Sequence, residues 1–178
     1  MRLLDALLVE FDHETGVTRQ LLQLVTEDRA GFRPHPKSYS LGELCLHLGR
    51  VLGWTAAIIR QPTFDLHPPD TPPAERPRFE SMASARAEFE RQAREARAAL
   101  AAASDAELLE TWSLKDGGKL LFTLPRAAVL RSWVFNHGIH HRGQLTVYLR
   151  LCEIPLPPVY GPTADSDARP EPYHQSQP

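Results

Sequence analysis

The sequence predicts an all-α protein, a four-helix bundle, and three observations lead to this fold class. Four stretches of the 178-residue chain carry apolar side chains at steps of three and four residues, the spacing of helices with one buried face. A proline-rich segment separates the second stretch from the third, as expected for a long crossover connection. The length suits a single hydrophobic core. We therefore expect one bundle domain over residues 1–162, followed by a flexible, polar and proline-rich tail over residues 163–178.

The first two helices follow from this spacing and from one capping signal. We expect the first helix over residues 2–26. The run Ser40-Leu41-Gly42-Glu43 has the Ser-x-x-Glu form of a capping box, so a second helix should begin there and continue to about Arg60. One face of this second helix carries Leu44, His47, Val51, Trp54 and Ile58.

The middle of the chain should contain the crossover, a third helix and a hairpin. Residues 61–78 hold six prolines and almost no periodicity, so we expect a loop without regular structure. Residues 81–103 predict a third helix, and Ser104 begins another capping signal for a short helical turn. Residues 112–114 and 119–123 flank an Asp-Gly-Gly sequence that suits a tight reversal. A short β-hairpin before the last helix is therefore expected.

The last helix is predicted from Pro125 to about Glu153, and it contains two histidines one helical turn apart. Its apolar stripe reads Leu130, Val134, His137, His141, Leu145, Tyr148 and Cys152. Positions i and i+4 share one face of a helix, so the imidazoles of His137 and His141 can converge on one ion. Gly138 and Gly143 each cost about 1 kcal/mol relative to alanine. We interpret them as sites of close helix approach or as space for a ligand.

A third histidine turns this pair into a candidate metal site. If the second and fourth helices face each other, His47 joins His137 and His141 to give three nitrogen donors. Any one of these histidines alone would be a satisfied core or surface residue, but two in one stripe and a third in another favour a shared ion. Three protein ligands leave a position open for water or substrate, which is the catalytic form of such a site. Nitrogen ligands suit zinc, nickel or iron(II).

Four residues near these histidines are candidates for the pocket or for support of the ligands. His140 and Gln144 lie on a neighbouring row of the last helix and could line the edge of the pocket. Glu43, one turn before His47, either serves the helix end or supports a ligand. Trp54, two turns after His47, is expected in the core rather than as a platform for substrate.

Other residues are expected outside the site. Cys45 turns roughly 200° away from His47 on its helix, and Cys152 lies about 16 Å beyond His141 along its axis, so both are interpreted as small buried side chains. The sequence does not contain His-Glu-x-x-His, because position 138 is glycine, and peptidase chemistry therefore loses its main support. The remaining histidines lie on a charged helix face, in loops and in the tail: His13, His35, His67 and His174.

Composition excludes several classes of partner. Twenty basic and 22 acidic side chains give a net charge of −2, so nothing indicates binding to nucleic acid. No segment approaches the roughly 20 apolar residues that cross a bilayer, and the first residues lack the pattern of a secretory signal. We therefore expect a cytoplasmic protein that does not contact a membrane.

Taken together, the capped helix with His47 and the later motifs closely resemble the DinB family over nearly the whole chain up to the tail. These later motifs are His137-x-x-x-His141-Arg142-Gly143-Gln144-Leu145, Tyr148-Leu149-Arg150, Pro155 and Tyr160-Gly161-Pro162. The resemblance implies a DinB/YfiT-like bundle, usually a homodimer, with a divalent metal ion held by the histidines that match His47, His137 and His141. The family name refers to induction by DNA damage and implies no contact with DNA.

The same resemblance suggests the chemistry. Relatives in the wider superfamily are transferases and isomerases that use low-molecular-weight thiols such as mycothiol or bacillithiol, and others are described as metal-dependent hydrolases. We therefore expect an enzyme whose ion activates a thiolate or a water for reaction with a small-molecule substrate. No side chain of this sequence can be assigned as a general acid or base. The alternative is a stress-associated, non-catalytic bundle that binds a metal ion or a small ligand.

Overall fold

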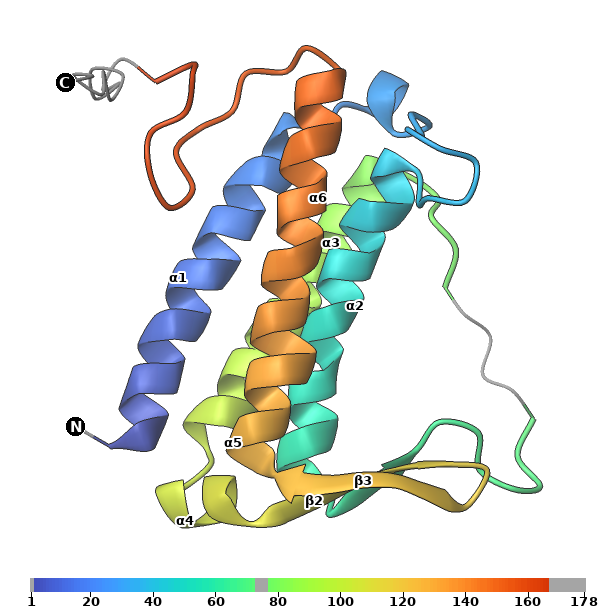
Figure 1. Ribbon diagram of the computed structural model, residues 1–178, viewed down its shortest axis with the longest axis vertical. Coiled ribbons are helices and arrows are strands. Elements are labelled where there is room, and N and C mark those ends of the chain that lie inside the picture. Colours follow the sequence, from blue (N-terminus) through green and yellow to red (C-terminus); the bar gives the residue numbers. More distant parts are fainter. Residues whose placement is uncertain (1, 73–76, 167–178) are drawn as a thin grey trace, which may run out of the picture.

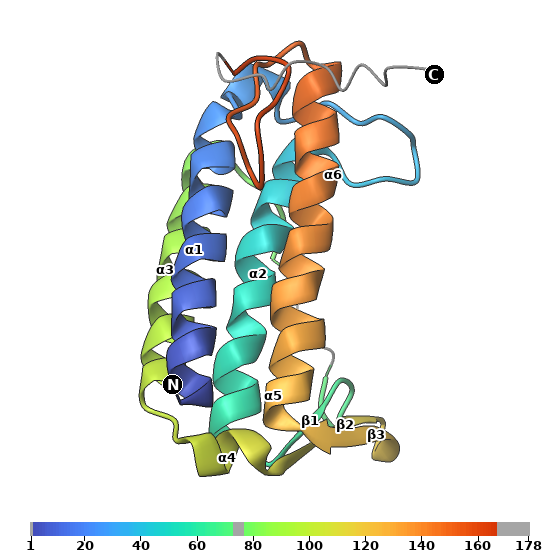
Figure 2. The ribbon, with the colours of Figure 1, turned by 60° about the vertical axis from the view of Figure 1, so that its left-hand side comes forward.

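The long helices lie side by side in a computed structural model that describes residues 2–72 and 77–166. Figures 1 and 2 show them forming the body of the molecule, with a small sheet at one end. The long helical segments of the described residues are α1 (Leu3–Leu24), α2 (Leu41–Arg60), α3 (Met82–Ala101) and the continuous stretch α5 (Arg126–Val129), η2 (Leu130–Asn136) and α6 (His137–Leu151). The prediction of a mainly helical protein is confirmed, and its helix boundaries differ from those expected by only a few residues.

The direction of the helices explains the long crossover. Helices α2 and α3 run the same way along the molecule, so the connection between them has to return along its length (Figure 1). Helix α2 makes its most extensive contacts with α3 and also packs against α6. At Gly49 of α2, an added Cβ would lie 3.0 Å from the Cα of Phe89 on α3. Glycine at this position therefore allows the two backbones to approach closely.

Both capping signals found in the sequence form as expected. The Ser40 hydroxyl accepts a hydrogen bond from the Glu43 N–H, and the Glu43 carboxylate accepts one from the Ser40 N–H. Ser104 and Glu107 make the same reciprocal pair at the start of the short helix α4 (Asp105–Leu109). These pairs satisfy backbone donors that have no partner within the helix, and they fix where each helix begins.

The predicted hairpin is present, and the structure adds a strand to it. Strands β2 (Thr111–Asp116) and β3 (Lys119–Pro125) are antiparallel. Gly117 and Gly118 form the turn with φ values of +58° and +80°, which glycine adopts without strain. The prediction that residues 61–78 lack regular structure was wrong, because β1 (Thr63–Asp65) pairs in parallel with β2. This strand has three residues, too few for alternation to reveal it.

A side-chain contact fixes the added strand. The Asp65 carboxylate accepts hydrogen bonds of 3.0 and 2.7 Å from the backbone N–H groups of Gly117 and Gly118. The strand therefore depends on a partner about 50 residues away in the chain, and local sequence carries no sign of it.

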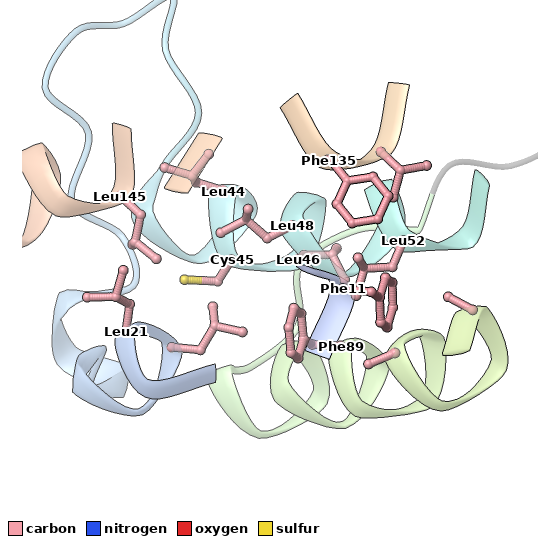
Figure 3. Packing of buried hydrophobic residues seen from close by; sticks show 14 of the residues in the cluster. Phe11, Leu21, Leu44, Cys45, Leu46, Leu48, Leu52, Phe89, Phe135 and Leu145 are labelled. Carbon is pink, nitrogen blue, oxygen red and sulfur yellow. The ribbon is translucent and has the colours of Figure 1, made fainter. Parts of the chain in front are cut away.

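The core lies between the helices, and its members match the apolar faces read from the sequence. Figure 3 shows leucine and phenylalanine side chains from α1, α2, α3 and the last helical stretch meeting there. Phe11 of α1 and Phe135 of η2 pack edge to face, with ring centroids 6.2 Å apart. All five apolar side chains of the predicted stripe on the last helical stretch are buried: Leu130, Val134, Leu145, Tyr148 and Cys152.

The interpretation of two glycines as points of close helix approach was wrong. An added Cβ at Gly138 or Gly143 of α6 would meet nothing within 4 Å. Among the described residues, close packing therefore requires glycine at neither position.

Helix α6 is tied to α1 by a buried ion pair. The Arg142 guanidinium, 2% exposed, pairs with the Glu14 carboxylate and donates a 3.0 Å hydrogen bond to the Glu14 carbonyl oxygen. The Tyr160 hydroxyl joins this cluster by donating to the Glu14 carboxylate at 2.8 Å. The chain after α6 is thereby folded back onto the helices.

The expected tail begins with an anchored turn. Asp165 pairs with Arg150 of α6, and the Thr163 N–H donates to the Ser166 hydroxyl. Residues 167–178 of that tail lie outside the described residues. Across the ranges that are described, none of the helices combines the length and apolarity that spanning a membrane requires.

Candidate metal centre

Three histidines from two helices bring one ring nitrogen each to a common point. His47 projects from α2, and His137 and His141 project from the first turns of α6. The Nε2 atoms of His137 and His141 lie 2.9 Å apart, and that of His47 lies 3.0 Å from His141 and 3.4 Å from His137. The spatial convergence expected from the two stripes is therefore present in the fold.

The spacing of these atoms fits a divalent ion. Metal–nitrogen bonds of about 2.0–2.1 Å separate two nitrogen ligands by about 2.9 Å at a right angle and about 3.4 Å at the tetrahedral angle. The three observed separations, 2.9, 3.0 and 3.4 Å, span the same interval. In the described part of the chain, these histidines are also the one group of potential ligands found close enough to share an ion.

The second ring nitrogen of His141 has an acceptor that fixes the tautomer. Its Nδ1 lies 2.8 Å from the side-chain oxygen of Gln144, which can only accept a hydrogen bond. The Gln144 amide nitrogen lies 3.1 Å from the Nε2 of His140, which is consistent with this orientation of the amide. His141 therefore carries its proton on Nδ1 and turns a lone pair on Nε2 toward the other histidines.

The ring of His137 is held in a comparable way by the backbone. Its imidazole is hydrogen bonded to the Trp133 carbonyl group, one turn earlier. In the backbone, the N–H of His137 itself bonds to the Val134 carbonyl, at the end of the π-helical segment η2. Since Nε2 of His137 faces the other rings, the hydrogen-bonded nitrogen is Nδ1.

These two hydrogen bonds leave an electrostatic conflict that a cation resolves. With protons on both Nδ1 atoms, the Nε2 lone pairs of His137 and His141 face each other at 2.9 Å. Two acceptors at this distance repel each other unless a proton donor or a cation lies between them. The three imidazole nitrogens therefore fit a bound metal ion. The Gln144 oxygen and the Trp133 carbonyl, which orient two of the rings, are also typical of the surroundings of metal ligands.

The protein also keeps these imidazoles neutral, the form that binds metals. Burial lowers the pKa of His47 to about 4, with smaller contributions from the two other histidines and from Arg50. Burial is also the main cause that lowers the pKa values of His137 and His141. All three lone pairs are thus available near neutral pH without displacement of a proton.

Two clefts with charged and polar side chains in their walls open beside the cluster, so a guest could reach it. A cleft of about 560 Å³ is bordered by His47, Tyr39 and Arg50. A second cleft, of about 540 Å³, is bordered by His141, Gln144 and Tyr39. The Tyr39 ring stands between them, with its centroid 5.3 Å from that of His47.

A third cleft is smaller and mainly apolar. It measures about 260 Å³ and is bordered by His47, Arg50, Trp54 and Phe64. The rings of Trp54 and Phe64 meet at 5.0 Å between centroids. The histidine cluster therefore borders two larger clefts of mixed or polar lining and one smaller cleft with aromatic walls.

The other candidates named from the sequence lie near the cluster but outside it. Glu43 takes part in the helix cap and in an ion pair with Arg33 at 2.9 Å, and it makes no hydrogen bond with His47. His140 is exposed, its ring meets that of His141 edge to face with centroids 4.9 Å apart, and its Nε2 lies 3.1 Å from the Gln144 amide nitrogen. Trp54 is partly buried, packs against Phe64 and Trp133 at the edge of the core, and also borders the apolar cleft.

Both cysteines are buried apart from the cluster. Burial raises the pKa of Cys45 to about 12, which keeps its thiol protonated. Cys152 is buried at the end of α6. Neither belongs to the group of potential ligands, in agreement with the sequence interpretation.

Sequence reasoning missed three contributors to this region. Arg50 lies three residues after His47, a spacing that places both on one side of α2 and could have identified it. Tyr39 comes from the loop before α2, where no periodic signal exists. The Trp133 carbonyl meets the His137 ring through a backbone contact that the apolar stripe does not reveal.

Comparisons with known proteins point to one family. A model of the DinB superfamily matches residues 10–145. Two solved structures are similar in fold. A DinB-like protein from Bacillus cereus is 19% identical, with 84% of this chain and 92% of that chain covered and a TM-score of 0.60. A DinB-like protein from Bacillus subtilis is 20% identical, with 86% and 96% covered and a TM-score of 0.67. No functionally curated protein matches the chain.

Proposed function

Because the chain belongs to the DinB superfamily and its three histidines converge, we propose that it is a metal-dependent enzyme acting on a small molecule, built on a DinB-type four-helix bundle. The observation that supports this proposal best is that the Nε2 atoms of His47, His137 and His141 face one another, with no two more than 3.4 Å apart. Three protein ligands leave part of the coordination sphere of an ion free, and the adjacent clefts provide space for a guest.

A divalent ion at this position supplies Lewis acidity, which lowers the pKa of a water or a thiol that binds it. Zinc, nickel and iron(II) all suit nitrogen ligands. We place transfer to a low-molecular-weight thiol first, because the resemblance to the family favours it, and hydrolysis second.

The residues around the three histidines would orient and shield the metal ligands rather than take part in the reaction themselves. Gln144 and the Trp133 carbonyl hold two imidazoles in the tautomer that turns Nε2 inward. Tyr39 packs against His47 and shields one side of the cluster from solvent. The carboxylate of Glu43 is occupied by the helix cap and by Arg33, so it does not serve as a base.

The proposal is tested by metal-dependent turnover. Protein stripped with a chelator and reloaded with zinc, nickel or iron(II) would be given a panel of thiols with 1-chloro-2,4-dinitrobenzene, and separately a p-nitrophenyl ester. We expect turnover by at least one metal form, loss of turnover in His141→Ala, and retention in His140→Ala. Absence of turnover with every metal, thiol and ester would remove the enzymatic proposal.

A non-catalytic role is the second candidate, and one observation favours it. Among the described residues, no carboxylate makes a hydrogen bond to any of the three histidines, so the site lacks an evident proton acceptor. In that case the ion would stabilise the fold. Its removal would then lower the melting temperature by many degrees, and the loaded site would hold no exchangeable water. The homodimer implied by the family resemblance stays a prediction in either case.

A further inference from the structure

We propose that the guest of this site is a small carboxylate with an apolar body, and that Arg50 binds its carboxylate group beside the three histidines. The proposal deepens the proposed function, on which it rests, by naming the chemical class of the substrate. Four observations support it: the position of Arg50, the absence of an ion pair or hydrogen bond to it among the described residues, the pairing of nearby carboxylates with other cations, and the aromatic cleft next to it.

Arg50 lies where a guest of the cluster would meet it. It follows His47 by three residues on α2, so the two side chains leave the helix on the same side. Arg50 and His47 together border both the 560 Å³ cleft and the 260 Å³ cleft. Its charge is also close enough to act on the His47 ring. A molecule that fills either cleft therefore touches the guanidinium and the histidine at once.

Arg50 has no ion-pair partner in the part of the chain that the structure describes. It is half-buried, yet it makes no hydrogen bond or ion pair with any described residue. A guanidinium offers five donors in a planar fork that matches a carboxylate. Such a fork at the edge of a cleft favours an anionic guest, because the guest would supply the missing acceptor.

The nearest carboxylates are already paired with other cations. Glu43 pairs with Arg33 at 2.9 Å and accepts from the Ser40 N–H at 2.7 Å. Glu88 of α3 pairs with Arg91 at 2.7 Å, while the charge of Arg50 acts on it without an ion pair and helps to lower its pKa. A second cation, Arg78, borders the larger cleft together with Arg50. The charge that faces this space is therefore positive, even though the whole chain is slightly acidic.

The apolar part of the guest is indicated by the smaller cleft. Its walls are Val51, Trp54, Ala57 and Phe64, while Arg50 and His47 stand at its polar side. Aromatic walls with a single charged group are typical of sites that bind a molecule with one apolar and one charged end. A ring or branched alkyl group would lie against Trp54 and Phe64, with its carboxylate at Arg50.

The test uses benzoate as the probe and isothermal titration calorimetry as the measurement, on full-length protein with and without zinc. We expect benzoate to bind the wild-type protein, and Arg50→Gln to weaken binding about tenfold to a hundredfold, as for loss of a charged hydrogen-bond pair. Benzamide, which keeps the ring but lacks the charge, should bind the wild type at least about tenfold more weakly. Acetate, which lacks the apolar body, should also bind more weakly.

Matched controls separate this proposal from the metal site. Arg60→Gln removes an exposed arginine at the end of the same helix and should leave benzoate affinity unchanged. The zinc content of Arg50→Gln should equal that of the wild type, because Arg50 is not a ligand. If the wild type binds no zinc, the proposed function fails, and the titration of zinc-free protein still tests Arg50.

Three results would overturn the inference. The first is no benzoate binding by the wild-type protein in either form. The second is equal affinity of the wild type and Arg50→Gln for benzoate, which would mean that the ion or the cleft alone holds the carboxylate. The third is equal affinity of the wild type for benzoate and benzamide, which would show that charge plays no part.

Discussion

Replacing Gln144 by alanine should weaken the binding of a divalent ion, although Gln144 is not one of the three histidines that would bind it. The Gln144 side-chain oxygen accepts a hydrogen bond from His141 Nδ1 at 2.8 Å, which fixes the ring and its tautomer. Loss of such an outer partner typically costs 10–100-fold in metal affinity. His141 is only partly buried, so water can replace the lost oxygen. We therefore expect a loss of metal affinity at the lower end of this range, about tenfold, which corresponds to about 1.4 kcal/mol.

Competition with a chromophoric chelator on zinc-loaded protein measures this effect. Gln144→Glu is the informative comparison variant. A carboxylate is a stronger hydrogen-bond acceptor than an amide oxygen, so this variant should bind zinc more tightly than the wild type. His140→Ala removes the other partner of Gln144 and should change the affinity less than twofold. An affinity of Gln144→Ala within twofold of the wild type would refute the role given to this hydrogen bond.

Three further predictions concern the stability of the fold. In metal-free protein, the folded-state pKa of His47 is lowered to about 4, below its value of about 6.5 in the unfolded chain, so stability should fall as the pH drops through this window. Thermal melts of His47→Gln should show a shallower slope there, and an unchanged slope would contradict the assignment. Gly143→Ala should stabilise α6 by up to about 1 kcal/mol, because its Cβ meets nothing within 4 Å. Gly49→Ala should cost about 1–3 kcal/mol, because its Cβ would lie 3.0 Å from the α3 backbone, and equal urea midpoints for these two variants would refute the packing argument. Arg142→Met should lower the free energy of unfolding by about 3 kcal/mol by leaving Glu14 unpaired, and a loss below about 1 kcal/mol would show that the ion pair matters little.

The sequence predicted the parts of the fold that local patterns specify. The apolar stripes of α2 and α6 located both helices and placed His47, His137 and His141 on faces directed toward the neighbouring helix. The capping box at Ser40 located the start of α2 to the residue. Asp-Gly-Gly located the hairpin turn. Each of these signals acts within a few residues, so it can be read without knowing the tertiary structure.

The parts that could not be predicted depend on contacts between distant segments. Strand β1 forms because it pairs with β2 and because the Asp65 carboxylate accepts hydrogen bonds from the hairpin turn. Its three residues are too few to show the alternation of apolar and polar side chains that marks a strand. The π-helical segment before His137 leaves the apolar stripe intact, so the spacing of apolar residues gives no sign of it. Gly138 and Gly143 suggested close packing from helix propensity alone, but the neighbouring helix lies elsewhere.

The clefts around the histidines were likewise hidden from the sequence. Tyr39 reaches the cluster from a loop, and Phe64 reaches the aromatic cleft from β1. Their positions depend on how the crossover and the loop before α2 fold over the helices. The ligand set could thus be named from spacing, whereas the walls of the space next to it could not.

Metal analysis of untagged protein, purified as the wild type and as three single variants, tests the central claim most directly. If imidazoles from α2 and α6 share one ion, the wild type and His140→Ala should each hold about one equivalent of a divalent metal. His47→Ala and His141→Ala should each lose most of it, while circular dichroism shows the same helix content. Stoichiometric metal in His47→Ala or in His141→Ala, or none in the wild type after incubation with zinc, nickel or iron(II), would contradict the account.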